Sequence, residues 1–190
     1  MTLSASTLWP ELTLGALVLS EAACTSGRRS WLATRRSADT RPMTRRERLV
    51  AERLGRGRSR KDIGHELGLS MTTLGRAIDR AAEKIGATTM DLVVLSAAFG
   101  PGGGRGGVRG IDEDRWSLHA PLDASEMWAR FSSAEREVVE LALGGLSSTS
   151  IAARRGDRSE RTIANQLAHV FRKADVSGRA ELAARLLIGA

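Results

Sequence analysis

Two groups of polar side chains in this sequence have the types and spacing that can read base pairs in DNA. Each group lies opposite an apolar stripe of helical period, one in residues 160–173 and one in residues 71–84. The first group is Glu160, Arg161, Asn165 and His169, and the second is Thr72 and Arg76. Arginine can form two hydrogen bonds with guanine, and asparagine two with adenine. Arg161, Asn165 and Arg76 are therefore the strongest candidates for base contacts.

The stripes that orient these side chains repeat at positions i, i+4, i+7 and i+11. One consists of Leu74, Ile78, Ala81 and Ile85, and the other of Ile163, Leu167, Val170 and Ala174. This period predicts two amphipathic helices whose apolar faces are buried. Ser70 and Ser159 stand immediately before them, where a hydroxyl can cap a helix N-terminus.

The two helices belong to a duplicated unit. Glu47, Arg48, Val50, Glu52, Gly57, Ser59, Ile63 and Gly68 recur 88 positions later, and after two single-residue insertions Leu92 aligns with Leu182. A match at a nearly constant offset indicates an internal repeat. We expect four helices in each copy, over residues 45–55, 59–67, 71–84 and 89–98, and over residues 133–143, 148–155, 160–173 and 178–188.

The segments outside the repeats predict smaller elements. Gly100–Gly110 reads as a flexible linker, and the weak alternation in Arg115–Leu122 predicts a short strand. Gly15–Cys24 and Ser30–Arg36 predict a β-hairpin about a turn at Gly27, with a helix over Leu12–Ala23 as the competing interpretation. The predicted domains are an N-terminal extension (1–42), a first helical domain (43–98), a linker (99–130) and a second helical domain (131–190).

Composition narrows the function classes. The 190 residues include 29 Lys and Arg against 22 Asp and Glu, a net charge of +7 that attracts polyanions. Cys24 is the only cysteine, which excludes an intramolecular disulfide and fits a reducing cytosol. The longest apolar stretch, Leu12–Cys24, is too short to span a bilayer. We therefore expect a cytoplasmic protein with no membrane partner.

No pattern in the chain predicts catalysis. His65, His119 and His169 have no second metal ligand at a helical or Cys/His spacing. The glycine-rich run lacks the Gly-Lys-Ser/Thr ending of a phosphate-binding loop. We expect no catalytic residue, metal, cofactor or small-molecule substrate, and no enzyme activity.

Taken together, the motifs of both repeats resemble the LuxR-type helix-turn-helix of response regulators. The second repeat is the closer match, through Ser133–Val139, Ser159–Leu167, Phe171–Lys173 and Arg179–Leu182. The first repeat carries the pattern in Met43–Arg48, Leu67–Ser70 and Lys84–Gly86. The resemblance implies four-helix domains whose third helix enters the DNA major groove, while the fourth often serves dimerisation.

These observations together predict a fold and a function. The expected fold is mainly α, with two four-helix LuxR-type domains joined by a glycine-rich linker and a small N-terminal β-hairpin. The expected function is transcription regulation on double-stranded DNA, with a homodimer or a related regulator as a further partner. Phosphate contacts are expected from side chains on or beside the third helix, namely Ser59, Arg60, Lys61, Arg80, Ser147, Thr162 and Arg172.

The two repeats differ in charge. Residues 43–95 hold 11 basic and 7 acidic residues, whereas residues 131–190 hold 9 and 7. The more basic copy has fewer base-reading side chains, so we predict that it mainly contacts phosphates and that the second copy reads bases. The alternative is a degenerate helix-turn-helix module that has lost DNA binding and serves protein interaction or dimerisation.

Overall fold

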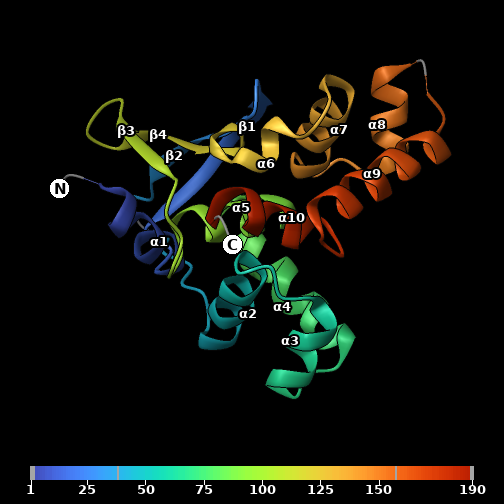
Figure 1. Cartoon of the computed structure of the whole chain (residues 1–190). Helices are drawn as coiled ribbons and strands as arrows, with labels where there is room; N and C mark the ends of the chain where they lie inside the picture. Colours follow the sequence, from blue (N-terminus) through green and yellow to red (C-terminus); the bar gives the residue numbers. More distant parts are fainter. Residues whose placement is uncertain (1–2, 38, 157, 189–190) are drawn as a thin grey trace.

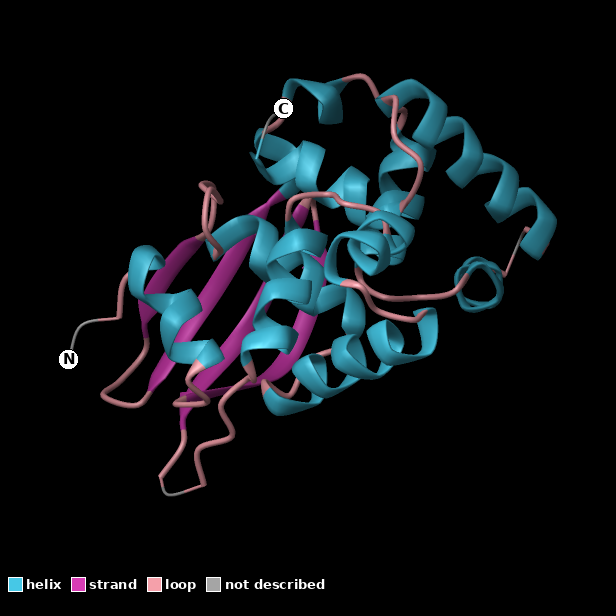
Figure 2. Ribbon diagram, turned by 90° about the horizontal axis from the view of Figure 1, so that it is seen from below, coloured by secondary structure: helices cyan, strands magenta, loops and turns pink. Residues whose placement is uncertain are grey.

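A four-stranded antiparallel sheet forms the platform of the molecule. The computed structural model describes residues 3–37, 39–156 and 158–188. The sheet contains β1 (Leu17–Thr25), β2 (Arg28–Arg35), β3 (Gly107–Gly110) and β4 (Arg115–Pro121), in the order β1-β2-β4-β3. Helices pack against it, as Figures 1 and 2 show.

Alternation of side chains explains why these segments form strands. Trp31 and Ala33 of β2 are buried, and they pair with Leu118 and Trp116 of β4, which are buried too. The residues between them are only partly buried, as expected where one face of a sheet is covered. β1 and β2 meet at a two-residue turn in which Gly27 has a φ of +74°, a conformation that glycine adopts without strain. The predicted hairpin is thus confirmed.

The helices of both repeats lie where the periodicity predicts them. The first repeat forms α2 (Arg45–Gly55), α3 (Arg60–Leu67), α4 (Met71–Lys84) and α5 (Thr89–Phe99). The second forms α7 (Ser133–Leu143), α8 (Ser148–Arg155), α9 (Glu160–Ala174) and α10 (Arg179–Ile188). The eight predicted ranges are confirmed to within one residue at each end. Serine or threonine caps seven of these helices, because its hydroxyl accepts a backbone N–H of the first turn.

The predicted fold class was nevertheless wrong. The hairpin is half of a larger sheet. β4 confirms the short strand predicted over Arg115–Leu122, whereas β3 comes from the glycine-rich run that was expected to be a flexible linker. The predicted linker domain (99–130) also contains a 3-10 turn, η1 (Leu122–Ala124), and a short helix, α6 (Glu126–Ala129). A further helix, α1 (Ala5–Thr13), precedes the sheet. Within the described residues, the fold therefore combines a four-stranded sheet with ten α-helices, instead of two four-helix domains joined by a flexible linker.

The sheet, the first repeat and α10 share one hydrophobic core. It includes Trp31 and Leu118 from the sheet, Ile78 from α4, Leu95 from α5 and Leu186 from α10. A smaller cluster holds α7, α8 and α9 together. α10 packs mainly against α5 of the other repeat, and Figure 1 shows the two helices together at the centre of the molecule. The two repeats are therefore joined through their fourth helices.

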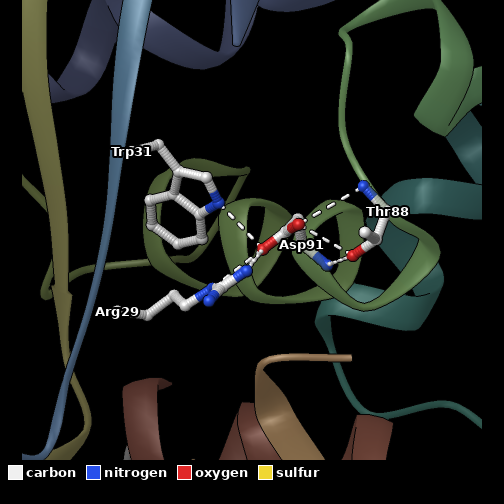
Figure 3. A network of polar contacts seen from close by, with 4 residues as sticks. All are labelled: Arg29, Trp31, Thr88 and Asp91. Carbon is white, nitrogen blue, oxygen red and sulfur yellow. Dashed lines mark hydrogen bonds and ion pairs between the residues drawn. The ribbon is translucent and has the colours of Figure 1, made fainter. Parts of the chain in front are cut away.

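A buried ion pair ties α5 to the sheet. Arg29 of β2 donates from Nε and Nη2 to Oδ1 of Asp91, at 2.9 and 2.5 Å, and the same oxygen accepts from Nε1 of Trp31 at 2.8 Å. The other carboxylate oxygen accepts from the hydroxyl of Thr88, the residue that caps α5. Figure 3 shows the four side chains converging between strand and helix. This network fixes where α5, and with it the junction of the repeats, lies on the sheet.

No helix in the described ranges combines the length and the apolar character that crossing a membrane requires.

Candidate nucleic-acid interface

One face of α4 is exposed on the surface of the molecule. Leu74, Ala77 and Ile78 are buried, whereas Thr72 and Arg76 on the other face are exposed. The structure thus places both predicted base-contact residues of the first repeat on the outer surface of one helix. Met71, Asp79 and Arg80 are exposed as well.

Beside this face lies a basic hollow. It has a volume of about 510 Å³ and is lined by Thr44, Arg45, Arg46, Glu47, Thr73, Arg76, Ala77 and Arg80. The start of α2 supplies two of the arginines and α4 supplies the other two. None of these four guanidinium groups has a hydrogen bond or ion pair with any described residue. An acidic ligand would therefore meet four unpaired positive charges.

The single acid in the hollow is already neutralised. Glu47 accepts from Nζ of Lys84 at 2.8 Å and from the backbone N–H of Thr44 at 2.7 Å. Burial opposes its ionisation, but these hydrogen bonds outweigh burial and hold the pKa of Glu47 below its usual value. Glu47 thus anchors the start of α2 to the end of α4 and leaves the positive charge of the arginines uncompensated.

The second repeat reproduces the anchor. Nζ of Lys173 lies 2.8 Å from Oε2 of Glu135, which also accepts from the backbone N–H of Ser132. Burial again opposes ionisation, and the bonds from Lys173 and Ser132 outweigh it, so the pKa of Glu135 is lowered too. The structure gives Lys84 and Lys173 equivalent positions in the two repeats, both engaged within the protein.

α9 presents the predicted base-reading set. Glu160, Arg161 and Asn165 are exposed on the face opposite Ile163 and Leu167. His169 is exposed on the same side, although its Nδ1 lies 3.3 Å from Oε1 of Glu135. Three predicted residues are thus free to contact a ligand, and the fourth is partly engaged.

The predicted phosphate-contact residues fall into separate places. Arg80 borders the basic hollow, and Arg172 is exposed late in α9. Arg60 and Lys61 are exposed at the start of α3. The hydroxyls of Ser59, Ser147 and Thr162 take part in helix caps, since Ser59 caps α3, Ser147 caps α8, and Thr162 bonds to the cap of α9. The hydroxyl candidates therefore already have partners inside the protein.

No protein-family model, curated protein or solved structure matches this chain.

Within the described residues, no group of three His, Cys, Asp or Glu side chains comes together as a metal site requires.

The two repeats differ sharply at equivalent positions. The second-repeat counterparts of Arg45, Arg46, Arg76 and Arg80 are Ser133, Ala134, Asn165 and His169. The arginine hollow therefore belongs to the first repeat alone. Arg76 and Arg80 were predicted as DNA-contact residues, whereas Arg45 and Arg46 were not. Their position directly after Thr44, the N-cap of α2, could have indicated that they lie at the exposed start of a helix.

Proposed function

We propose that this chain binds double-stranded DNA and regulates transcription, with α4 and α9 as the helices that enter the major groove. The observation that carries the proposal is the pairing of an exposed helix face with four unpaired arginines at α4. Phosphates bind arginine through charge-assisted hydrogen bonds, and the major groove of B-DNA admits a single α-helix. α9 repeats the arrangement of caps and buried stripe with different side chains on its outer face.

The contrast between the helices supports a division of roles. Around α4, positive charge dominates, and charge gives affinity that does not depend on sequence. On α9, Arg161 and Asn165 are exposed and offer the fork-shaped hydrogen bonding that distinguishes guanine and adenine. The first repeat accordingly makes mainly phosphate contacts, with Arg76 as its one strong candidate for a base contact, and the second repeat makes most of the base contacts. The LuxR-type resemblance of the sequence implies that the third helix of each repeat, α4 or α9, enters the major groove.

Titration of labelled DNA at a series of salt concentrations tests the first role. Each phosphate contact contributes about 0.9 to the slope of log affinity against log salt. The triple variant R45Q/R46Q/R80Q should therefore lower that slope by about 2 to 3. The matched control is R28Q/R109Q/R130Q, which removes the same charge from exposed arginines elsewhere. Equal effects of both triple variants would show that net charge alone, and not the hollow, drives binding.

Selection of bound fragments from a random DNA library tests the second role. Arg161→Ala should relax the preference at one base position, at a cost of roughly 1–3 kcal/mol for the preferred base. Arg76→Ala should weaken all sequences more evenly. The reverse pattern would contradict the division of roles. No salt-dependent DNA binding at all would favour the alternative of a protein-interaction module.

A further inference from the structure

We infer that a single chain acts as its own dimer, placing α4 and α9 on two inverted and unequal half-sites of one DNA duplex. The inference rests on the proposed function, because it concerns how the two helix faces engage DNA together. It specifies three things that DNA binding alone does not: one chain per site, opposite orientation of the half-sites, and fixed spacing between them.

The orientation follows from a reciprocal contact between the repeats. Gly57, in the turn after α2, faces α10, since a Cβ built there would lie 3.1 Å from Cβ of Ala184. Its counterpart Gly145, in the turn after α7, faces the start of α5, since a Cβ there would lie 3.3 Å from Oγ1 of Thr88. The turn of each repeat thus contacts the fourth helix of the other.

Such mutual contact defines the symmetry. Two units related by a two-fold axis present the same patch to each other, so every contact occurs twice with the partners exchanged. Two units related by translation meet through different patches, and the contact occurs once. In this chain α10 contacts α2, α5 contacts α7, and α5 and α10 contact each other, so the elements exchange partners as in the first pattern. The side chains that meet Gly57 and Gly145 lie about one helical turn apart in the two fourth helices. We therefore infer that α4 and α9 are related by an approximate half-turn. Helices related in this way read sequences of opposite orientation.

The stoichiometry follows from burial of the fourth helices. Along α5 every residue from Asp91 to Phe99 is buried. On α10 the buried residues are Leu182, Ala183, Ala184, Leu186 and Leu187. A second copy could pair through these helices only after they had separated from each other. The surface that would join two chains is thus already occupied within one.

The fixed spacing follows from the shared core. α5 and α10 belong to the same hydrophobic cluster as the sheet, and the ion pair of Asp91 with Arg29 holds α5 in place. Figure 1 shows α3 and α4 below this centre, and α8 and α9 to its upper right. α4 and α9 are therefore attached to the same packed core, which fixes the distance between them. A flexible linker would instead allow a range of distances between the two helices.

The half-sites are unequal because the reading faces are. α4 offers Arg76 beside the arginine hollow, and α9 offers Arg161 and Asn165. A homodimer would present identical faces and select a palindrome. This chain should select two different half-sites in inverted order.

Library selection followed by a spacing series tests the inference. The wild-type chain is first used to select its preferred duplex, and the mass of the complex is measured by native mass spectrometry. Three altered duplexes are then compared: one with 5 base pairs inserted between the half-sites, one with 10, and one with the second half-site reversed. We expect one chain of 20.4 kDa per duplex and a loss of affinity of at least about tenfold for every altered duplex, because one half-site is lost.

The outcomes separate the inference from the function on which it rests. Two chains per duplex, equal affinity for the reversed half-site, or tolerance of the insertions would each overturn the inference while leaving DNA binding intact. Absence of any complex would overturn both. Because the series changes only the DNA, it does not depend on whether a variant folds. Ala184→Trp, aimed at the contact with Gly57, adds a protein-side test and should reduce the discrimination between spacings.

Discussion

Replacing Asp91 by asparagine tests whether the ion pair under α5 holds the molecule together. The carboxylate is 2 % exposed and accepts from donors on three residues, at distances from 2.5 to 3.3 Å. Every group around it is a hydrogen-bond donor in the structure, so an amide would point its own N–H groups at other donors. Arg29, 5 % exposed, would also lose its counter-charge. Leaving one buried charge unpaired costs roughly 3–5 kcal/mol.

Guanidinium denaturation followed by tryptophan fluorescence measures this cost. With a denaturant slope of about 4 kcal/mol per M, a loss of 4 kcal/mol moves the midpoint by about 1 M. Asp114→Asn is the matched control: Asp114 bonds Arg35 at 3.0 Å, but its side chain is 65 % exposed. Such surface pairs contribute less than about 1 kcal/mol. Equal losses for the two variants would refute the reasoning that burial makes the Asp91 pair decisive.

Three further predictions follow from other parts of the structure. The pKa of Glu135 is lowered in the folded protein, so its stabilisation is present above about pH 4.5, the ordinary value, and is lost as the pH falls through the folded-state pKa. Glu135→Gln should therefore flatten the fall of the melting temperature with acid, whereas the exposed Glu113→Gln should not. Partial burial raises the pKa of the Cys24 thiol to about 12, so alkylation near pH 8 should be roughly a thousandfold slower in the folded than in the unfolded chain; equal rates would contradict the raised pKa. Gly27→Ala should lower the midpoint of unfolding, because a Cβ there would lie 2.6 Å from Cβ of Asp123 in a turn of positive φ; an unchanged midpoint would mean that the turn adapts.

The local elements of this protein could be predicted from sequence because they depend on neighbours along the chain. The apolar stripe of Ile163 and Leu167 determines the buried face of α9, and Ser159 determines where it begins. Both signals lie within one or two turns of the helix. The exposed positions of Arg161 and Asn165 follow directly from that stripe, so their placement was available without the structure.

The sheet could not be predicted because its pairings join distant segments. Trp31 pairs with Leu118 and Ser30 with His119, each across more than eighty residues. The strand β3 is rich in glycine, which is uncommon in strands, so its sequence indicates a linker. β3 nevertheless pairs with β4 in the structure, and glycine at position 107 leaves room for the ring of His119 on the neighbouring strand.

The basic hollow could not be predicted either, because its arginines come from two helices that are separated in the sequence. Arg45 and Arg46 belong to α2, while Arg76 and Arg80 belong to α4. Their proximity depends on how these two helices cross, which the bond of Glu47 to Lys84 helps to set. Periodicity assigns a side chain to a face of its own helix, but it does not say which other helix stands beside that face.

The packing of α5 against α10 bears on how the protein would respond to its own abundance. A regulator assembled from two chains must first associate, so the concentration of its active dimer rises with the square of the chain concentration when the protein is scarce. If this chain binds DNA as its own dimer, as proposed, that second-order step is absent, and its occupancy of DNA should follow a simple hyperbola down to the lowest expression levels. The two repeats are also different segments of one sequence, so a substitution in one repeat leaves the other unchanged. Each reading helix can thus diverge alone, which a homodimer does not permit.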